Sequence, residues 1–267
     1  MDIKVPRHIT DWMRFETLLK ELLGFTKELI NSLEGKKIDY EYQRVLYKFI
    51  QRFHLNFVTI NNTWKEYLNN TKFRHPFYLL LRSLVSDCIL MVYLIEGLKF
   101  EKKTKEPLET EFKIRYIEIS NSYFTRLEKE IEKQISEKKL TPKQREKYLK
   151  GEREFYPDHF ELGEKIKVKK IGNSDPGTII KKLKNGGYKK LTTIYQYYFY
   201  FSQYEHFSMK TEDLLDSKTE KEFEILTNTV GYLIQGLLLN IGVMQLDKEL
   251  LTKLSKVIDG FEERFRK

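Results

Sequence analysis

A histidine, a serine and a tyrosine lie close together in an unusually aromatic segment, Tyr195–Met209. Ser202 and His206 are four residues apart, and Tyr204 lies between them. In a helix, that spacing places the hydroxyl of Ser202 and the imidazole of His206 one turn apart on the same face. Histidine can act as a general acid or base near neutral pH, and tyrosine can donate to a developing negative charge. The alternative interpretation is a histidine satisfied inside the core, with Ser202 bonded to a backbone carbonyl.

Two opposite charges stand in the most apolar segment of the chain, 77–97. Arg82 and Asp87 are five residues apart there, so they do not face each other on a helix. Because unpaired charges in a buried helix are costly, we expect each to find a partner on another helix. The two residues indicate either a buried polar network that fixes helix register or a functional site.

The patterns of several common enzyme and metal sites are missing from the sequence. There is no GxSxG turn, no P-loop ending in GK[ST], and no HxxxH, HExxH or HxH spacing. The single cysteine, Cys88, excludes a cysteine-based zinc site and an intramolecular disulfide, and its apolar surroundings favour an inert thiol. We therefore expect no metal and no cofactor.

Positive charge is concentrated in one region. The chain has a formal net charge of +9, and residues 101–190 contain 24 Lys and Arg against 16 Asp and Glu. A concentrated lysine patch attracts polyanions through counterion release, and it reads charge rather than base identity. The alternative is a solvated loop. The candidate nucleic-acid-binding residues are Lys181, Lys182, Lys184, Lys189 and Lys190.

The spacing of apolar residues predicts an all-α protein. Apolar positions three and four residues apart predict helices at about 10–35, 39–70, 77–97, 108–138, 176–184, 189–209, 218–246 and 247–265. The segment 189–209 also has the composition of a strand, but no partner strand is evident. The polar stretch after 131 predicts a helical extension that is broken at Thr141-Pro142, with a loop or small hairpin over 151–175.

We expect a single helical domain, 1–267. Its multi-helix bundle would be centred on 77–97, 189–209 and 218–246, and a protruding basic helical arm, 101–190, would be inserted between core helices.

The longest apolar stretches, 77–98 and 230–246, are interrupted by charged or amide residues. They are better explained as buried core helices than as membrane spans. The first residues lack the basic stretch and apolar core of a signal peptide. We expect a cytoplasmic protein with no membrane partner.

The segments FYLLLRSLVSD and YYFYFSQYEHFS resemble the paired signatures of a poorly characterised bacterial helical family. In that family, one helix carries an arginine with an acidic residue five positions on, and a later helix carries tyrosine, serine and histidine. The matching positions here are Arg82, Asp87, Ser202 and His206, and the resemblance covers about a third of the chain.

More loosely, the arrangement is similar to HEPN domains, helical bundles of toxin and defence RNases in which one helix supplies an arginine and, five or six residues later, a histidine. This chain departs from that pattern because Phe199 and Tyr200 stand where the arginine would be, so Arg82 would act from a neighbouring helix. The resemblance implies a metal-independent RNase, with His206 as general acid or base, Arg82 as phosphate contact and Tyr204 as orienting donor.

HEPN-like proteins usually act as dimers, so the resemblance also implies a homodimer. The alternative function is a non-catalytic module that uses its lysines to bind nucleic acid or an acidic partner protein.

Overall fold

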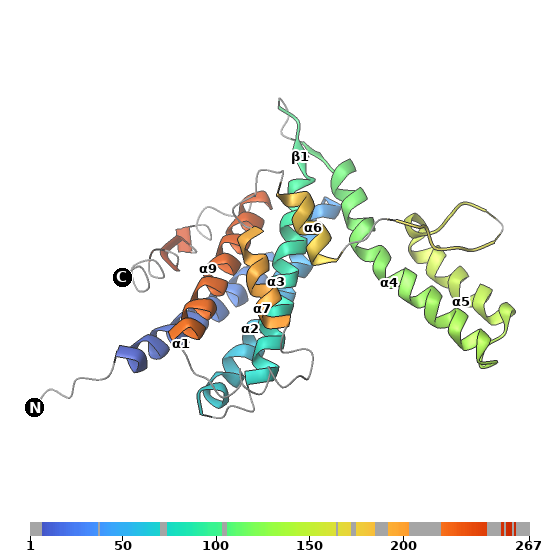
Figure 1. Cartoon of the computed structure of the whole chain (residues 1–267). Helices are drawn as coiled ribbons and strands as arrows, with labels where there is room; N and C mark the ends of the chain where they lie inside the picture. Colours follow the sequence, from blue (N-terminus) through green and yellow to red (C-terminus); the bar gives the residue numbers. More distant parts are fainter. Residues whose placement is uncertain are drawn as a thin grey trace, which may run out of the picture.

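The computed structural model is built almost entirely of helices, so the all-α prediction is confirmed (Figure 1). The structure describes residues 7–36, 38–69, 74–102, 106–163, 165–171, 175–184, 192–202, 220–244, 252–253, 255–257 and 259.

The first two helices, α1 (Arg7–Leu33) and α2 (Glu41–Asn69), are long, amphipathic and packed against each other. Their apolar residues recur three and four positions apart, so each helix buries one face. Gly35 follows the end of α1 with a φ of +78°, a left-handed conformation that glycine adopts without a steric penalty. The chain can therefore turn back into α2 within a few residues.

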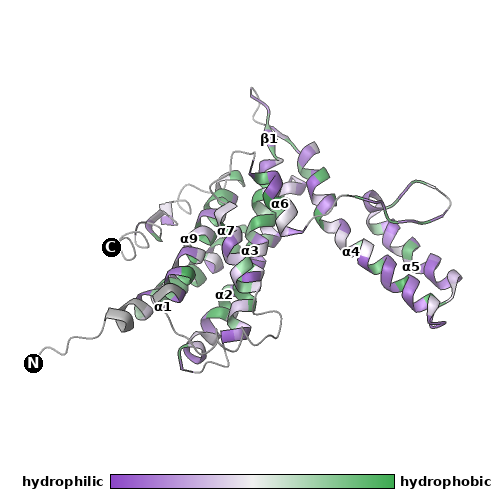
Figure 2. Ribbon diagram, viewed as in Figure 1, coloured by the Kyte–Doolittle hydropathy of each residue, from purple (hydrophilic) through white to green (hydrophobic). Residues whose placement is uncertain are grey.

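At the centre of the bundle lies α3 (Arg74–Glu96), which is buried along most of its length from Phe77 to Ile95. It contacts α2, α6 (Pro176–Leu183), α7 (Ile194–Ser202) and α9 (Glu220–Val243). Figure 2 shows this apolar helix surrounded by the others. A helix that is apolar on nearly all sides is stable in water only when neighbouring helices cover it.

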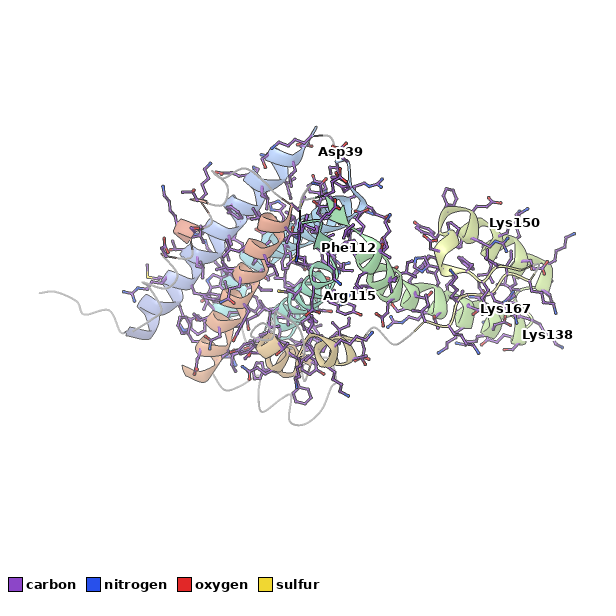
Figure 3. All side chains as sticks on the ribbon, turned by 90° about the horizontal axis from the view of Figure 1, so that it is seen from above. Asp39, Phe112, Arg115, Lys138, Lys150 and Lys167 are labelled. Carbon is purple, nitrogen blue, oxygen red and sulfur yellow. The ribbon has the colours of Figure 1, made fainter. Side chains whose placement is uncertain are left out.

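After α3, strands β1 (Lys99–Phe100) and β2 (Pro107–Leu108) form a short antiparallel pair. The next helix, α4 (Thr110–Ser136), begins against α3 and runs away from the bundle (Figures 1 and 3). Thr141 then begins α5 (Pro142–Phe155) with a capping box, and proline occupies the first turn, where its missing N–H is not needed. The predicted break at Thr141-Pro142 is confirmed.

We use the term arm for residues 120–171, which project from the bundle (Figure 3). The arm contains most of α4, all of α5, the short helix η2 (Pro157–His159) and a narrow hairpin joined by a bridge between Phe160 and Val168. A small apolar cluster of its own holds these pieces together: Phe124, Ile131, Leu149, Phe160, Ile166 and Val168.

The projecting part is shorter than the predicted 101–190. Ile179, Ile180 and Leu183 of α6 are buried in the main core against α3, so α6 belongs to the bundle. The β1–β2 pair was not predicted, because two-residue strands leave no periodic signal in a charged turn.

Two of the described helices, Arg74–Glu96 and Glu222–Val243, are long and apolar enough to cross a membrane. Core helices pass the same test, and most of each apolar window is buried inside the protein, as predicted for core helices.

Candidate functional site

Arg82 reaches from α3 to the aromatic helix α7. Its Nη2 donates to the hydroxyl of Tyr198 at 3.1 Å, and the guanidinium carbon lies 5.1 Å from the centroid of the Tyr198 ring. These two residues are 116 positions apart in the chain. The expectation that Arg82 finds a partner on another helix is confirmed, and the partner lies on α7, which ends at Ser202, four positions before His206 in the sequence.

Ser202 joins the same group through the backbone. Its Oγ donates to the carbonyl oxygen of Tyr198 at 2.7 Å, so the hydroxyl proton is used in the local bond that serine often makes inside a helix. We call this the Arg82–Tyr198–Ser202 group. Tyr204 and His206 lie outside the described residues.

Asp87 takes part in a separate interaction. Its carboxylate accepts from Arg52 of α2, with Nε–Oδ2 at 3.0 Å and Nη2–Oδ1 at 2.7 Å. The structure therefore does not bring Asp87 to Arg82, although each has found its partner on another helix. Burial raises the pKa of Asp87, and the charge of Arg52 only partly counteracts this effect.

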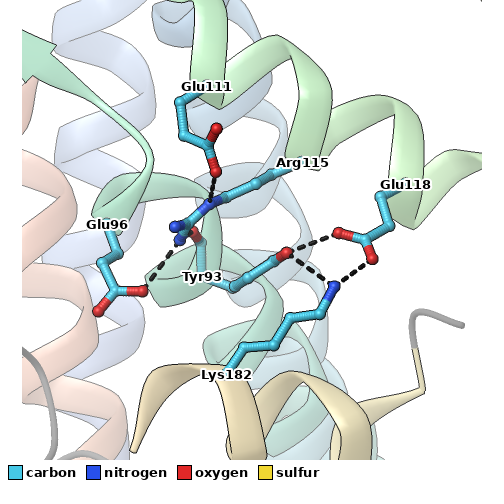
Figure 4. A network of polar contacts seen from close by, with 6 residues as sticks. All are labelled: Tyr93, Glu96, Glu111, Arg115, Glu118 and Lys182. Carbon is cyan, nitrogen blue, oxygen red and sulfur yellow. Dashed lines mark hydrogen bonds and ion pairs between the residues drawn. The ribbon is translucent and has the colours of Figure 1, made fainter. Parts of the chain in front are cut away.

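Lys182, predicted to hold a nucleic-acid backbone, points into a polar network between α6, α4 and α3 (Figure 4). Its Nζ contacts a carboxylate oxygen of Glu118 and lies 3.3 Å from the hydroxyl of Tyr93, which itself donates to Glu118 at 2.6 Å. Burial lowers the pKa of Lys182, but hydrogen bonds to these two residues outweigh it and leave the pKa raised.

Arg115 of α4 completes this network. Its guanidinium lies over the ring of Tyr93, 4.5 Å from the centroid, and contacts the carboxylates of Glu111 and Glu96 at 2.9 Å each (Figure 4). It also donates to the carbonyl oxygen of Tyr93 at 2.8 Å. The network ties the base of α4 to α3 and α6, and so fixes how the arm leaves the bundle.

The other predicted lysines are divided between the surface and the undescribed part of the chain. Lys181 and Lys184 are exposed at the end of α6, whereas Lys189 and Lys190 lie outside the described residues. Lys182 is also exposed, but its Nζ is already paired with Glu118, which sets it apart from Lys181 and Lys184.

A histidine that sequence reasoning missed lines a cleft of about 650 Å³ on the arm. Nε2 of His159 lies 3.2 Å from Oγ of Ser120, and its ring stacks on Phe124 with centroids 4.4 Å apart. Because Ser120 donates its own proton to the carbonyl of Tyr116, Nε2 is the donor in the contact. Burial lowers the pKa of His159, which favours the neutral ring.

Within the described part of the chain, no group of three or more His, Cys, Asp or Glu side chains is placed to hold a metal ion. Comparisons with protein-family models, curated protein sequences and solved structures find no match to this chain.

Proposed function

We propose that this protein acts on RNA as a HEPN-like, metal-independent endoribonuclease of a bacterial defence or toxin system. The observation that carries the proposal is the contact of Arg82 with Tyr198, one turn before Ser202. Arg82 and Ser202, which come from two distant segments, both bond to Tyr198, on the helix that precedes His206 in sequence. In the same proposal the protein is cytoplasmic and acts as a homodimer.

The chemistry follows from the residue types. His206 takes the proton of a ribose 2′-hydroxyl, and the 2′-oxygen attacks the adjacent phosphorus. The bond from phosphorus to the 5′-oxygen breaks, and that oxygen receives a proton from a general acid. The products are a 2′,3′-cyclic phosphate and a 5′-hydroxyl end.

Arg82 contributes electrostatic stabilisation in this proposal. A guanidinium presents several N–H donors in a planar fork, which suits the oxygens of a phosphate that gains negative charge in the transition state. Tyr198 orients the guanidinium through its hydroxyl and its ring. Asp87 acts at a distance, because it pairs with Arg52 and holds α2 against α3.

A second candidate function is a non-catalytic module that binds nucleic acid or an acidic protein. The pairing of Asp87 with Arg52 favours it, because that pair satisfies a buried charge without any need for a reaction. In this alternative, Arg82 and His206 are internal polar residues and binding depends on lysines alone.

The test is cleavage of labelled RNA by the purified protein in excess EDTA, followed by analysis of the new ends. Four variants are compared with wild type: His206→Ala, Arg82→Lys, Tyr198→Phe and the control His54→Ala. His54 lies on α2 and contacts Thr26 of α1, away from α7. Thermal melts of all five proteins show whether each variant is folded.

We expect wild type and His54→Ala to produce 2′,3′-cyclic phosphate ends, and His206→Ala to produce none while melting like wild type. Arg82→Lys should keep its charge but lose most of the rate, because lysine lacks the planar fork. Cleavage that persists in folded His206→Ala would overturn the catalytic assignment. A folded wild type that binds RNA without cleaving it would support the second candidate.

A further inference from the structure

Helix α5 carries a row of lysines on the face that points away from α4. Lys143, Lys147 and Lys150 follow one another at intervals of four and three residues, so they share one side of the helix. All three are exposed and line a groove of about 610 Å³. The far wall of the groove includes Ile166, which lies on the hairpin of the arm.

The hairpin adds two more cations beside this groove. Lys165 and Lys167 flank Ile166 and are exposed, while Ile166 itself is buried. Arg145 of α5 donates to the carbonyl oxygen of Ile166 at 3.2 Å, which holds the hairpin next to the helix. Figure 3 shows Lys150 and Lys167 together on the arm, well separated from the bundle.

None of these lysines makes an ion pair within the described part of the chain. Arg145 is paired with Glu128 and Glu132, whereas no carboxylate of a described residue lies within ion-pair distance of the five lysines around the groove. Glu146 lines the groove and stands four residues before Lys150, the spacing of a helical ion pair, yet the two do not pair. Like charges in a row on a helix destabilise it, so this arrangement suits an external anion.

Exposed aromatic rings stand next to the lysine row. Tyr148 and Phe155 lie seven residues apart on the neighbouring face of α5, with 60% and 81% of their surfaces exposed. Rings of this size are usually buried, and two on one exposed helical face form a platform on which flat ligands can stack. Lysines that contact phosphates beside rings that stack on bases are the features of a single-stranded nucleic-acid surface.

We propose that the outer face of α5, with the adjoining hairpin, binds single-stranded nucleic acid. Lys143, Lys147 and Lys150 contact successive backbone phosphates, and Tyr148 and Phe155 stack on unpaired bases. The inference rests on the proposed function for its choice of nucleic acid as ligand, and it places the principal contact on the arm rather than on α6.

The test is fluorescence anisotropy with a labelled single-stranded deoxyoligonucleotide of about 12 nucleotides, which is within the range of known single-strand sites, and with its duplex. The deoxy probe lacks the 2′-hydroxyl, so the protein cannot cleave it by the proposed reaction. The arm variant is Lys143→Ala/Lys147→Ala/Lys150→Ala. The matched control is Lys27→Ala/Lys48→Ala/Lys65→Ala, which removes three exposed lysines without ion pairs from α1 and α2 and gives the same net charge.

We expect the arm variant to bind about tenfold or more weakly than wild type, and the control to bind within about twofold. Each phosphate contact on a single strand contributes about 0.7 to the slope of log affinity against log salt, so the arm variant should lose about 2 from that slope. Tyr148→Ala/Phe155→Ala, which removes two stacking rings, should weaken single-strand binding about thirtyfold or more and leave the slope unchanged. No variant should melt below wild type by more than a few degrees, because all these side chains are exposed.

Equal losses in the arm and control variants would overturn the proposal, because they would mean that net charge alone drives binding. Duplex binding as tight as single-strand binding would also overturn it. If polyglutamate of equal charge displaces the labelled oligonucleotide, the proposal is overturned as well, because that result would indicate an acidic protein partner. Binding that depends on the arm in a protein without RNase activity would refute the catalytic proposal alone, and cleavage unaffected by the arm variant would refute this inference alone.

Discussion

Replacing Arg52 by alanine leaves the carboxylate of Asp87 buried without its cation. Asp87 is only 2% exposed and takes contacts of 3.0 and 2.7 Å from the guanidinium. Removing one partner of a buried pair typically costs about 3–5 kcal/mol. The Arg52 side chain is 60% exposed, however, so solvent screens the pair and can reach the carboxylate after truncation. We expect a loss of about 2 kcal/mol in the free energy of unfolding, or about 5 °C in Tm.

This loss should depend on pH with a definite sign. Burial raises the pKa of Asp87 in the folded protein, and Arg52 opposes the rise. Without Arg52 the folded-state pKa rises further, while the unfolded-state pKa keeps its ordinary value. When a carboxyl group has a higher pKa in the folded protein than in the unfolded one, the free energy of unfolding falls as the pH rises from the unfolded-state pKa through the folded-state pKa. The difference between wild type and Arg52→Ala should therefore be largest at neutral pH and shrink in acid.

Urea denaturation at neutral and acidic pH measures both effects. Arg44→Ala serves as control, because Arg44 is an exposed arginine on the same helix without an ion pair in the described chain, and should change stability by less than about 0.5 kcal/mol. The double variant Arg52→Ala/Asp87→Asn should recover part of the loss, since it removes the uncompensated charge. Equal effects of Arg52→Ala and Arg44→Ala, or a loss independent of pH, would refute the reasoning.

Two further predictions compare neighbouring positions. Lys182→Ala should lower the free energy of unfolding by about 1–2 kcal/mol, because a largely buried carboxylate and a phenol lose their cation. Lys181→Ala should change it by less than about 0.5 kcal/mol in the same urea titration, and similar values for the two variants would contradict the network. Gly236→Ala in α9 would place a Cβ 2.5 Å from the sulfur of Cys88 on α3 and should lower the free energy of unfolding by about 1–3 kcal/mol. In Gly242→Ala on the same helix, the new Cβ meets no atom within 4 Å, and thermal melts should show a gain of about 0.5–1 kcal/mol. A stabilised Gly236→Ala would contradict the packing of α9 on α3.

The helices could be predicted because their signals are local. Apolar periodicity marks α1, α2 and α4, and the capping residue Thr141 with the following proline marks the start of α5. The need of Arg82 and Asp87 for partners on other helices could also be predicted, because it follows from burial alone. The residues that pair with Arg82 and Asp87 could not be predicted.

The identity of those partners depends on contacts across long stretches of chain. Lys182 pairs with Glu118, 64 residues away, and with Tyr93, 89 residues away. No local pattern distinguishes it from Lys181: both lysines are exposed, and only the way α6 packs brings the Nζ of Lys182 to Glu118. The same holds for Tyr198, because only the packing of α7 brings its hydroxyl, rather than that of the preceding Tyr197, to the guanidinium of Arg82.

The pairing of Lys182 with Glu118 changes where a polyanion can bind. A lysine whose charge already interacts with Glu118 offers a phosphate little, since the carboxylate would have to give up its partner. Within the described residues, the five lysines around the groove carry no such pairing, so the basic character of residues 101–190 that is open to a ligand lies mainly on α5 and its hairpin. The network around Arg115 holds α4, and with it this basic surface, at a fixed angle to the bundle (Figure 4). In this arrangement one set of cations orients the arm, and the other is available to a ligand.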